Sequence, residues 1–195
     1  MKPLFTILVL VLFITSCSPD NGDGMFSAYN VCIWDNTTYS QSLSASAADT
    51  NEELFDASDS KYLAQNFTLN EDKELWGVEL YLSRSSSIPT SGFYLEIAGD
   101  DNNAPNPQET TGRTEVKLYS DITTSPSWVA LQFEEIPHLE ANTVYWIKLI
   151  PYYTAGSSHV IWHHDGSGSG LYKSSNETSW TQVTGQAAFR FLPCR

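Results

Sequence analysis

Positively charged residues are scarce in this sequence. Its 195 residues include 10 lysines and arginines against 23 aspartates and glutamates, for a formal net charge of −13. Proteins that bind nucleic acid draw much of their affinity from cations placed against phosphates. An acidic chain with so few cations is a poor partner for DNA or RNA, so we expect no nucleic-acid partner.

Methionine and long helix-forming runs are also scarce, whereas aromatic residues are abundant. The chain has two methionines, but six tryptophans and ten tyrosines, and aromatic residues make up 13% of it. Hydrophobic residues account for 41%, which is typical of a globular protein. If the first 16 residues are a removable leader, 179 of the 195 residues remain. That length supports one domain with a sizeable core and is short for two.

The first residues have the layout of a secretory signal. Lys2 precedes the apolar run Leu4–Ile14, which is too short to span a bilayer comfortably. The stretch that follows, Ile14-Thr15-Ser16-Cys17, resembles the lipobox of bacterial lipoproteins. The resemblance implies that residues 1–16 are removed and that the sulfur of Cys17 carries a diacylglycerol. The alternative is an ordinary signal peptide with a chance cysteine at its end.

Residues 17–27 are expected to form a lipidated tether ahead of a domain over residues 28–195. Residues 18–24 contain no apolar side chain, which indicates a flexible segment. Two or three acyl chains hold a protein stably on a membrane, whereas one binds only marginally. By similarity to the sorting rule of enteric lipoproteins, Ser18 favours the outer membrane, and an acidic tether resembles some surface-export signals.

Two cysteines remain once Cys17 is assigned to the lipid. An exported protein matures where disulfides form, and Cys32 and Cys194 allow one pairing. Such a bridge closes a long loop and stabilises by about 4–5 kcal/mol in the chain-entropy model. We predict this disulfide; two buried free thiols are the alternative.

Alternating apolar residues dominate the chain after residue 27. In the run Trp76–Leu82, every second residue is apolar and faces one way, and Phe93–Ile97 repeats the pattern. The run Val144–Ile150 is nearly all apolar, which is typical of a central strand. Clusters of Gly, Pro, Ser, Asp and Asn separate these runs, as in a sandwich or barrel of antiparallel strands. One helix-like piece is expected near Thr50–Phe55, where Thr50 and Glu53 fit a capping box.

The order of these segments resembles a known fold. The stretches that carry the resemblance are Ala64–Thr68, Leu75–Leu80, Leu139–Ile147, Trp162 and Ala188–Phe191. Together they resemble the jelly-roll β-sandwich domains appended to secreted and wall-anchored bacterial proteins, which are similar in shape to carbohydrate-binding modules. The resemblance covers residues 60–192. It implies an all-β chain with a single jelly-roll-like antiparallel β-sandwich.

Sugars stack their apolar faces on rings beside a few placed polar groups, so aromatic and polar residues that a hairpin after Val144–Ile150 would bring together are candidates for sugar contact, as is a tryptophan in a polar stretch. The candidate ligand-binding residues are Tyr152, Tyr153, Trp162, His164 and Trp180. The alternative is that these rings cap the core, as Trp and Tyr often do.

One loop has the composition of a calcium site. Asp100, Asp101 and Asn102 supply the oxygen ligands that Ca²⁺ prefers, although such clusters are also ordinary turn chemistry. His163 and its neighbour His164 point to opposite faces of a strand, so no zinc site is expected. Calcium is the one cofactor that the sequence suggests.

These observations favour a non-catalytic binding or adhesion lipoprotein with a glycan ligand. The alternative is a structural accessory subunit of a cell-envelope complex. A glycoside hydrolase comes third, because it needs two close carboxylates, for which Glu79 and Glu96 are the candidates. No nucleophile elbow accompanies the Ser-Gly-rich stretch at 166–170.

Overall fold

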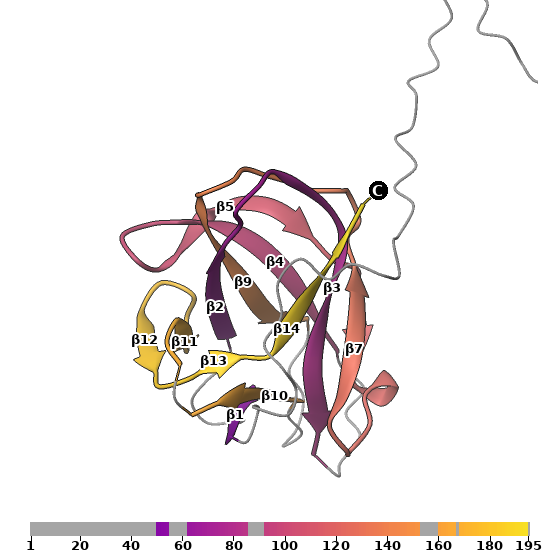
Figure 1. Cartoon of the computed structure of the whole chain (residues 1–195). Coiled ribbons are helices and arrows are strands. Elements are labelled where there is room, and N and C mark those ends of the chain that lie inside the picture. Colours follow the sequence, from indigo (N-terminus) through magenta and orange to yellow (C-terminus); the bar gives the residue numbers. More distant parts are fainter. Residues whose placement is uncertain (1–49, 55–61, 86–91, 153–159, 167, 195) are drawn as a thin grey trace, which may run out of the picture. The chain divides into compact units, whose positions relative to one another are not determined.

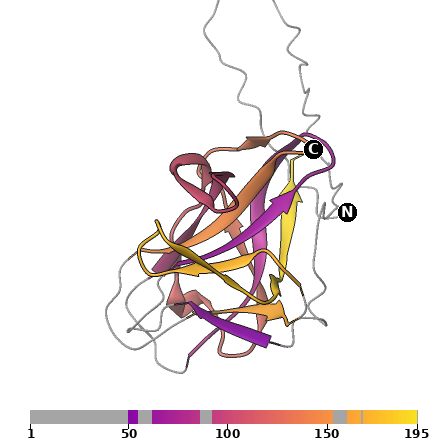
Figure 2. The same cartoon turned by 90° about the vertical axis from the view of Figure 1, so that its left-hand side faces the viewer.

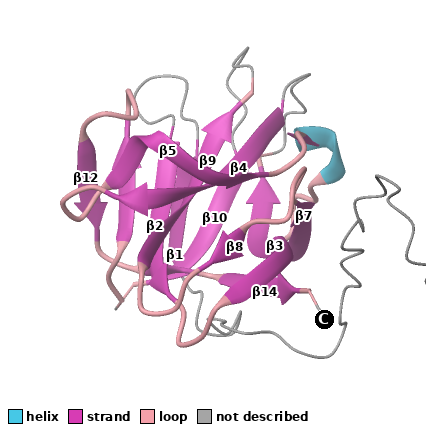
Figure 3. Cartoon of the chain, turned by 90° about the horizontal axis from the view of Figure 1, so that it is seen from above, coloured by secondary structure: helices cyan, strands magenta, loops and turns pink. Residues whose placement is uncertain are grey.

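Two antiparallel sheets make up the described part of the chain in the computed structural model (Figure 1). The structure describes residues 50–54, 62–85, 92–152, 160–166 and 168–194. Every described residue belongs to one unit of the chain, Cys32–Arg195. Strands account for nearly all of the regular structure there, with one 3₁₀ turn, η2 (Tyr119–Asp121) (Figure 3).

Sheet I has the central order β1-β10-β3-β14. Its strands are β1 (Thr50–Leu54), β10 (Val160–Asp165), β3 (Lys73–Arg84) and β14 (Phe189–Pro193), with β13 (Gln186–Ala187) paired to β10 and with β7 (Ser127–Gln132) and β8 (His138–Leu139) paired to β3. The long strand β3 is therefore the scaffold of this sheet.

Sheet II has the order β12-β11-β2-β9-β4-β5. Its strands are β12 (Trp180–Val183), β11 (Leu171–Ser174), β2 (Tyr62–Thr68), β9 (Val144–Pro151), β4 (Gly92–Asp100) and β5 (Pro105–Arg113), with β6 (Lys117–Leu118) paired to β4. The pairings β2–β9 and β4–β9 place the nearly all-apolar strand β9 at the centre, as its sequence predicts.

Strands that follow one another in the chain repeatedly belong to opposite sheets (Figure 2). The strand β2 lies in sheet II, β3 in sheet I and β4 in sheet II; β9, β10 and β11 alternate in the same way. This crossing between layers is the connectivity of a jelly-roll-like sandwich. The predicted fold class, an all-β antiparallel β-sandwich, is confirmed.

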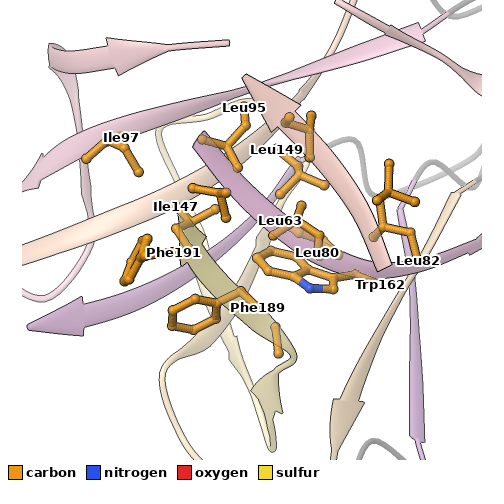
Figure 4. Packing of buried hydrophobic residues seen from close by; sticks show 14 of the residues in the cluster. Leu63, Leu80, Leu82, Leu95, Ile97, Ile147, Leu149, Trp162, Phe189 and Phe191 are labelled. Carbon is orange, nitrogen blue, oxygen red and sulfur yellow. The ribbon is translucent and has the colours of Figure 1, made fainter. Parts of the chain in front are cut away.

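The core is built from every second residue of both sheets (Figure 4). In β4, the side chains of Phe93, Leu95 and Ile97 are fully buried, whereas Tyr94 and Glu96 between them are partly exposed on the other face. The strand β3 contributes Leu80 and Leu82 from the opposite layer in the same way. Period-two alternation thus fixes one inner and one outer face for each strand.

The expectation of a helix near Thr50 is wrong. Thr50–Leu54 is the strand β1, which pairs antiparallel with β10 from Thr50 opposite His164 to Leu54 opposite Val160. A capping box is a local signal worth about 1 kcal/mol. Pairing along the edge of an existing sheet outweighs it.

Several predictions concern parts of the chain outside the described residues. These are the leader and tether (1–27), the lipid on Cys17, the contact at Tyr153, and the partner of the Cys32–Cys194 bridge at Cys32. They stay predictions. Within the described ranges, no helix has the length and apolar character needed to cross a membrane.

Candidate functional site

A row of six residues crosses the outer face of sheet II from one edge strand to the other. Each residue stands opposite the next in the strand register: Gln182, Tyr172, Ala64, Lys148, Glu96 and Arg113. Their chain neighbours Leu63, Leu95 and Leu149 point into the core. The row therefore lies on the face of the sheet that the core does not use.

Lys148 is a buried cation at the centre of this row. Its side chain is 2% exposed, and its Nζ lies 3.0 Å from Glu96 Oε2 and 3.7 Å from Glu177 Oε2. The side chains of Glu96 and Glu177 are 14% and 31% exposed. A buried charge is tolerated when it is paired, and here the register between β9 and β4 supplies the closer carboxylate.

Glu177 reaches Lys148 from the turn between β11 and β12. Asn176 Oδ1 accepts hydrogen bonds from the backbone N–H of Thr178 at 3.1 Å and of Ser179 at 3.0 Å. The indole N–H of Trp180 donates to the Glu177 carbonyl at 3.0 Å. Glu177 itself has a φ of 63°, a left-handed value that is uncommon outside glycine.

Rings pack around the charged centre. The buried ring of Trp146 meets Tyr172 edge-on with centroids 5.0 Å apart, and its indole N–H donates to Asp100 Oδ1 at 2.7 Å. Tyr172 and Trp180 pack on the small cluster that Trp146 forms with two buried alanines. The Arg113 guanidinium lies 4.0 Å from the centre of the Tyr94 ring, which is a cation–π distance.

Two tyrosine hydroxyls beside the carboxylates are held in their protonated form. Burial raises the pKa of Tyr62 above its usual value, and the charge of Glu177 and a hydrogen bond to it raise this pKa further. Burial also raises the pKa of Tyr94, with the charge of Glu96 adding to the rise and Arg113 opposing it. Both hydroxyls are therefore available as hydrogen-bond donors at neutral pH.

We call this surface the aromatic face. It consists of the half-buried rings of Tyr62, Tyr94, Tyr172 and Trp180 and the charged side chains of Lys148, Glu96, Glu177 and Arg113. Rings beside placed donors and acceptors are suited to holding a polar ligand with apolar faces.

The sequence-predicted ligand residues are not brought together. Trp180 lies on the aromatic face, and Tyr152 is 62% exposed beyond the end of β9. His164 is buried at the end of β10. The expectation for Trp162 is corrected: its ring is fully buried in the core, and its indole N–H donates to the Ala188 carbonyl at 2.9 Å. The pairing of β10 with β3 turns this side of β10 inward.

The loop proposed as a calcium site is a tight hairpin turn. Asn102 and Asn103 have φ values of 54° and 65°, and the Asp101 and Ala104 backbones exchange two hydrogen bonds, which is the geometry of a type I′ turn. Asp100 Oδ1 accepts from Trp146, and Asp100 Oδ2 accepts from the Asn103 N–H at 3.3 Å.

The carboxylate oxygens of Asp100 therefore serve the fold. In the part of the chain that the structure describes, no group of three or more His, Cys, Asp or Glu side chains is placed to hold a metal ion. The calcium prediction for Asp100, Asp101 and Asn102 stays a prediction, and the two hydrogen bonds that Asp100 accepts favour ordinary turn chemistry there.

Glu79 and Glu96 do not form a hydrolase pair. Glu79 is in β3 of sheet I and Glu96 is in β4 of sheet II. Both alternate with core residues, so they project from opposite outer faces of the sandwich. Stacked sheets are about 10 Å apart, and the two carboxylates point away from each other across that layer.

A second polar pair lies in sheet I. Ser83 Oγ and His163 Nε2 are 2.9 Å apart, and both residues are buried. Burial lowers the pKa of His163, and the neighbouring His164 lowers it further. The imidazole is therefore neutral at pH 7, as a buried histidine with one hydroxyl partner is expected to be.

Most of the aromatic face was not predicted from the sequence. A charged residue in a nearly all-apolar strand was the available signal, since Lys148 is the one charged residue in Val144–Ile150 and buried charges need partners. Comparisons with protein-family models, with curated proteins and with solved structures found no match to this chain.

Proposed function

We propose that this chain is a membrane-anchored, non-catalytic glycan-binding lipoprotein and that the aromatic face is its glycan site. The observation that carries the proposal is the set of four half-buried rings, Tyr62, Tyr94, Tyr172 and Trp180, around a polar centre on one sheet face. Sugars combine apolar ring faces with hydroxyl edges, and this surface offers rings and hydrogen-bonding groups side by side.

The dimensions of the face favour an oligosaccharide over a single sugar. Trp180 is on β12 and Tyr94 is on β4, and the strand order places four strand spacings between them. At about 4.8 Å per spacing, the rings extend over about 19 Å. A chain ligand lying across the strands contacts several rings in turn.

The anchor supports a role at a membrane surface. The leader and Cys17 resemble those of bacterial lipoproteins, and Ser18 after the cysteine favours the outer membrane by the same resemblance. A flexible tether over residues 18–24 lets a domain reach ligands beyond the lipid headgroups. The proposed location is the outer membrane, with the domain exposed at the cell surface.

The accessory-subunit alternative calls for a broad apolar surface. In the described ranges, Ile136 and Val144 are exposed at separate places, whereas Leu118 and Tyr152 both flank Gly92: Leu118 stands opposite Gly92 in the pairing of β6 with β4, and the Tyr152 N–H donates to the Gly92 carbonyl. This small apolar patch is the feature that favours a protein partner, and the aromatic face is the feature that favours a glycan.

The experiment is a titration of the purified full-length chain against a broad polysaccharide panel. Trp180→Ala removes a ring of the aromatic face, and Trp128→Ala is the matched control because Trp128 is a half-buried ring of sheet I. Tenfold weaker binding corresponds to about 1.4 kcal/mol, and we expect at least that loss for Trp180→Ala alone. An equal loss in both variants, or no saturable binding, contradicts the proposal.

A further inference from the structure

Glu177 is the outermost carboxylate in contact with Lys148. Glu96 already pairs with the ammonium at 3.0 Å, whereas Glu177 lies at 3.7 Å and is more than twice as exposed, 31% against 14%. Of two ion pairs with the same cation, the one with the longer distance and the more exposed carboxylate is the easier one to break. The Glu177 side chain can turn into water while Glu96 stays in place.

The turn that carries Glu177 is held by other groups. Asn176 caps it through two backbone N–H groups, and Trp180 donates to the Glu177 carbonyl. None of these bonds uses the Glu177 carboxylate. A left-handed φ of 63° at a glutamate is a backbone position that Asn or Gly adopts at lower cost. Glutamate at this position places a carboxylate over Lys148, and the hydrogen bonds within the turn do not depend on that carboxylate.

The groups around that carboxylate form a cradle for an anion. Lys148 Nζ is within salt-bridge distance of it. The Tyr62 hydroxyl is hydrogen-bonded to it, and Tyr94 is close enough for its pKa to be raised by the same charge. Arg113, which stands opposite Glu96 in the row, adds an exposed guanidinium over the Tyr94 ring.

We propose that the ligand of the aromatic face is an acidic glycan, and that a uronate carboxylate of the ligand takes the place of the Glu177 carboxylate on Lys148. This inference rests on the proposed function, since it names the class of glycan for the same site. The Tyr62 hydroxyl then donates to the ligand carboxylate as it now donates to Glu177.

The exchange keeps the buried cation paired. A ligand carboxylate replaces one anionic partner of Lys148 by another, so no unpaired charge is left in the site. A neutral sugar that displaces Glu177 leaves Lys148 with Glu96 alone and brings no charge in return. Glu177 therefore competes with every ligand for the contact with Lys148, but only an acidic ligand replaces the negative charge that it displaces, so the site discriminates against neutral ligands.

The test compares glycans that differ only in charge. The full-length chain is titrated with oligomers of galacturonate, mannuronate, guluronate and glucuronate, with the fully methyl-esterified form of each, and with sulfated galactan oligomers. Esterification removes the negative charge and leaves the sugar ring unchanged. We expect at least one uronate series to bind tenfold more tightly than its ester.

Three variants separate the effect of the cradle from the effect of net charge. Glu177→Gln removes the competing carboxylate and is expected to tighten uronate binding at least threefold. Glu135→Gln makes the same change of net charge in the exposed turn between β7 and β8 and is expected to leave uronate affinity unchanged. Lys148→Met is expected to abolish the preference of the site for the acid over the ester.

The outcomes separate the two proposals. If methyl esters or neutral glycans bind as tightly as uronates, or if Glu177→Gln and Glu135→Gln behave alike, the acidic-ligand inference fails and the glycan site stands. Binding of sulfated galactan without any uronate overturns the carboxylate assignment. If no glycan of any class binds, both proposals fail.

Discussion

Removing the charge of Lys148 and removing the charge of Glu96 are expected to lower the free energy of unfolding by different amounts. Lys148 is 2% exposed, so its ammonium has almost no access to water. Glu96 and Glu177 are 14% and 31% exposed and keep some water when the cation is gone. Removing the carboxylate of Glu96 is therefore expected to cost more free energy of unfolding than removing the ammonium.

The magnitudes follow from burial. Removing one partner of a buried ion pair costs about 3–5 kcal/mol, because the other charge is left uncompensated. Glu96→Gln leaves Lys148 with Glu177 at 3.7 Å, so we expect a loss near the lower end, about 3 kcal/mol. Lys148→Met leaves two carboxylates that reach water and fills the space with an apolar chain, so we expect a loss below that range.

Urea unfolding and thermal melts of the three proteins measure these differences. For a chain of this size, 1 kcal/mol shifts the melting temperature by about 2–4 °C, so Glu96→Gln is expected to lower it by about 6–12 °C. The double variant Glu96→Gln/Lys148→Met should recover part of that loss. If Lys148→Met is as damaging as Glu96→Gln, the burial of the ammonium is not what sets the energetics, and the argument fails.

Three further predictions test the fold. Trp162→Ala is expected to lower the free energy of unfolding by about 3–5 kcal/mol in urea, because it empties a core position; a loss under about 1 kcal/mol places the ring elsewhere. The pKa of His163 is depressed below its ordinary value of 6.5 in the folded chain. The unfolded chain therefore binds more protons below that pH, and the free energy of unfolding is expected to fall from pH 6.5 towards pH 5. This fall should be shallower in His163→Gln, and equal pH profiles for the two proteins would contradict the prediction. Asn103→Val should lower the free energy of unfolding by about 1–2 kcal/mol, because residue 103 has a φ of 65°. EDTA is expected to leave the melting temperature unchanged, because the carboxylate oxygens of Asp100 already accept hydrogen bonds from the protein; a lower melting temperature in EDTA would support a calcium site in this loop.

Strand positions were predictable because period-two alternation is a local signal. In Phe93–Ile97, five residues are enough to predict which side chains face inward and which face outward, and the structure has that arrangement. The error at Thr50–Leu54 has the opposite cause, since that segment pairs with β10, more than 100 residues away. A capping pattern is read from four neighbours and carries no information about such a partner.

Burial of individual aromatic residues was not predictable, because it depends on register between distant strands. Trp162 stands between Ile161 and His163, Trp180 stands between Ser179 and Thr181, and both were candidates for sugar contact. Pairing of β10 with β3 sends Trp162 into the core, and pairing of β12 with β11 leaves Trp180 on the outer face. The aromatic face is assembled in the same way, with Tyr62 and Tyr94 brought to one surface by strands that both pair with β9.

The central claim is that the aromatic face of sheet II binds a glycan, and hydroxyl-radical footprinting of the full-length chain tests it most directly. The oxidation rates of Tyr62, Tyr172 and Trp180 are compared with and without a saturating polysaccharide, and Trp128 on sheet I is the internal reference. The account predicts protection of the three rings of sheet II and an unchanged rate at Trp128. Saturable binding with no protection on sheet II, or with protection at Trp128 instead, contradicts it.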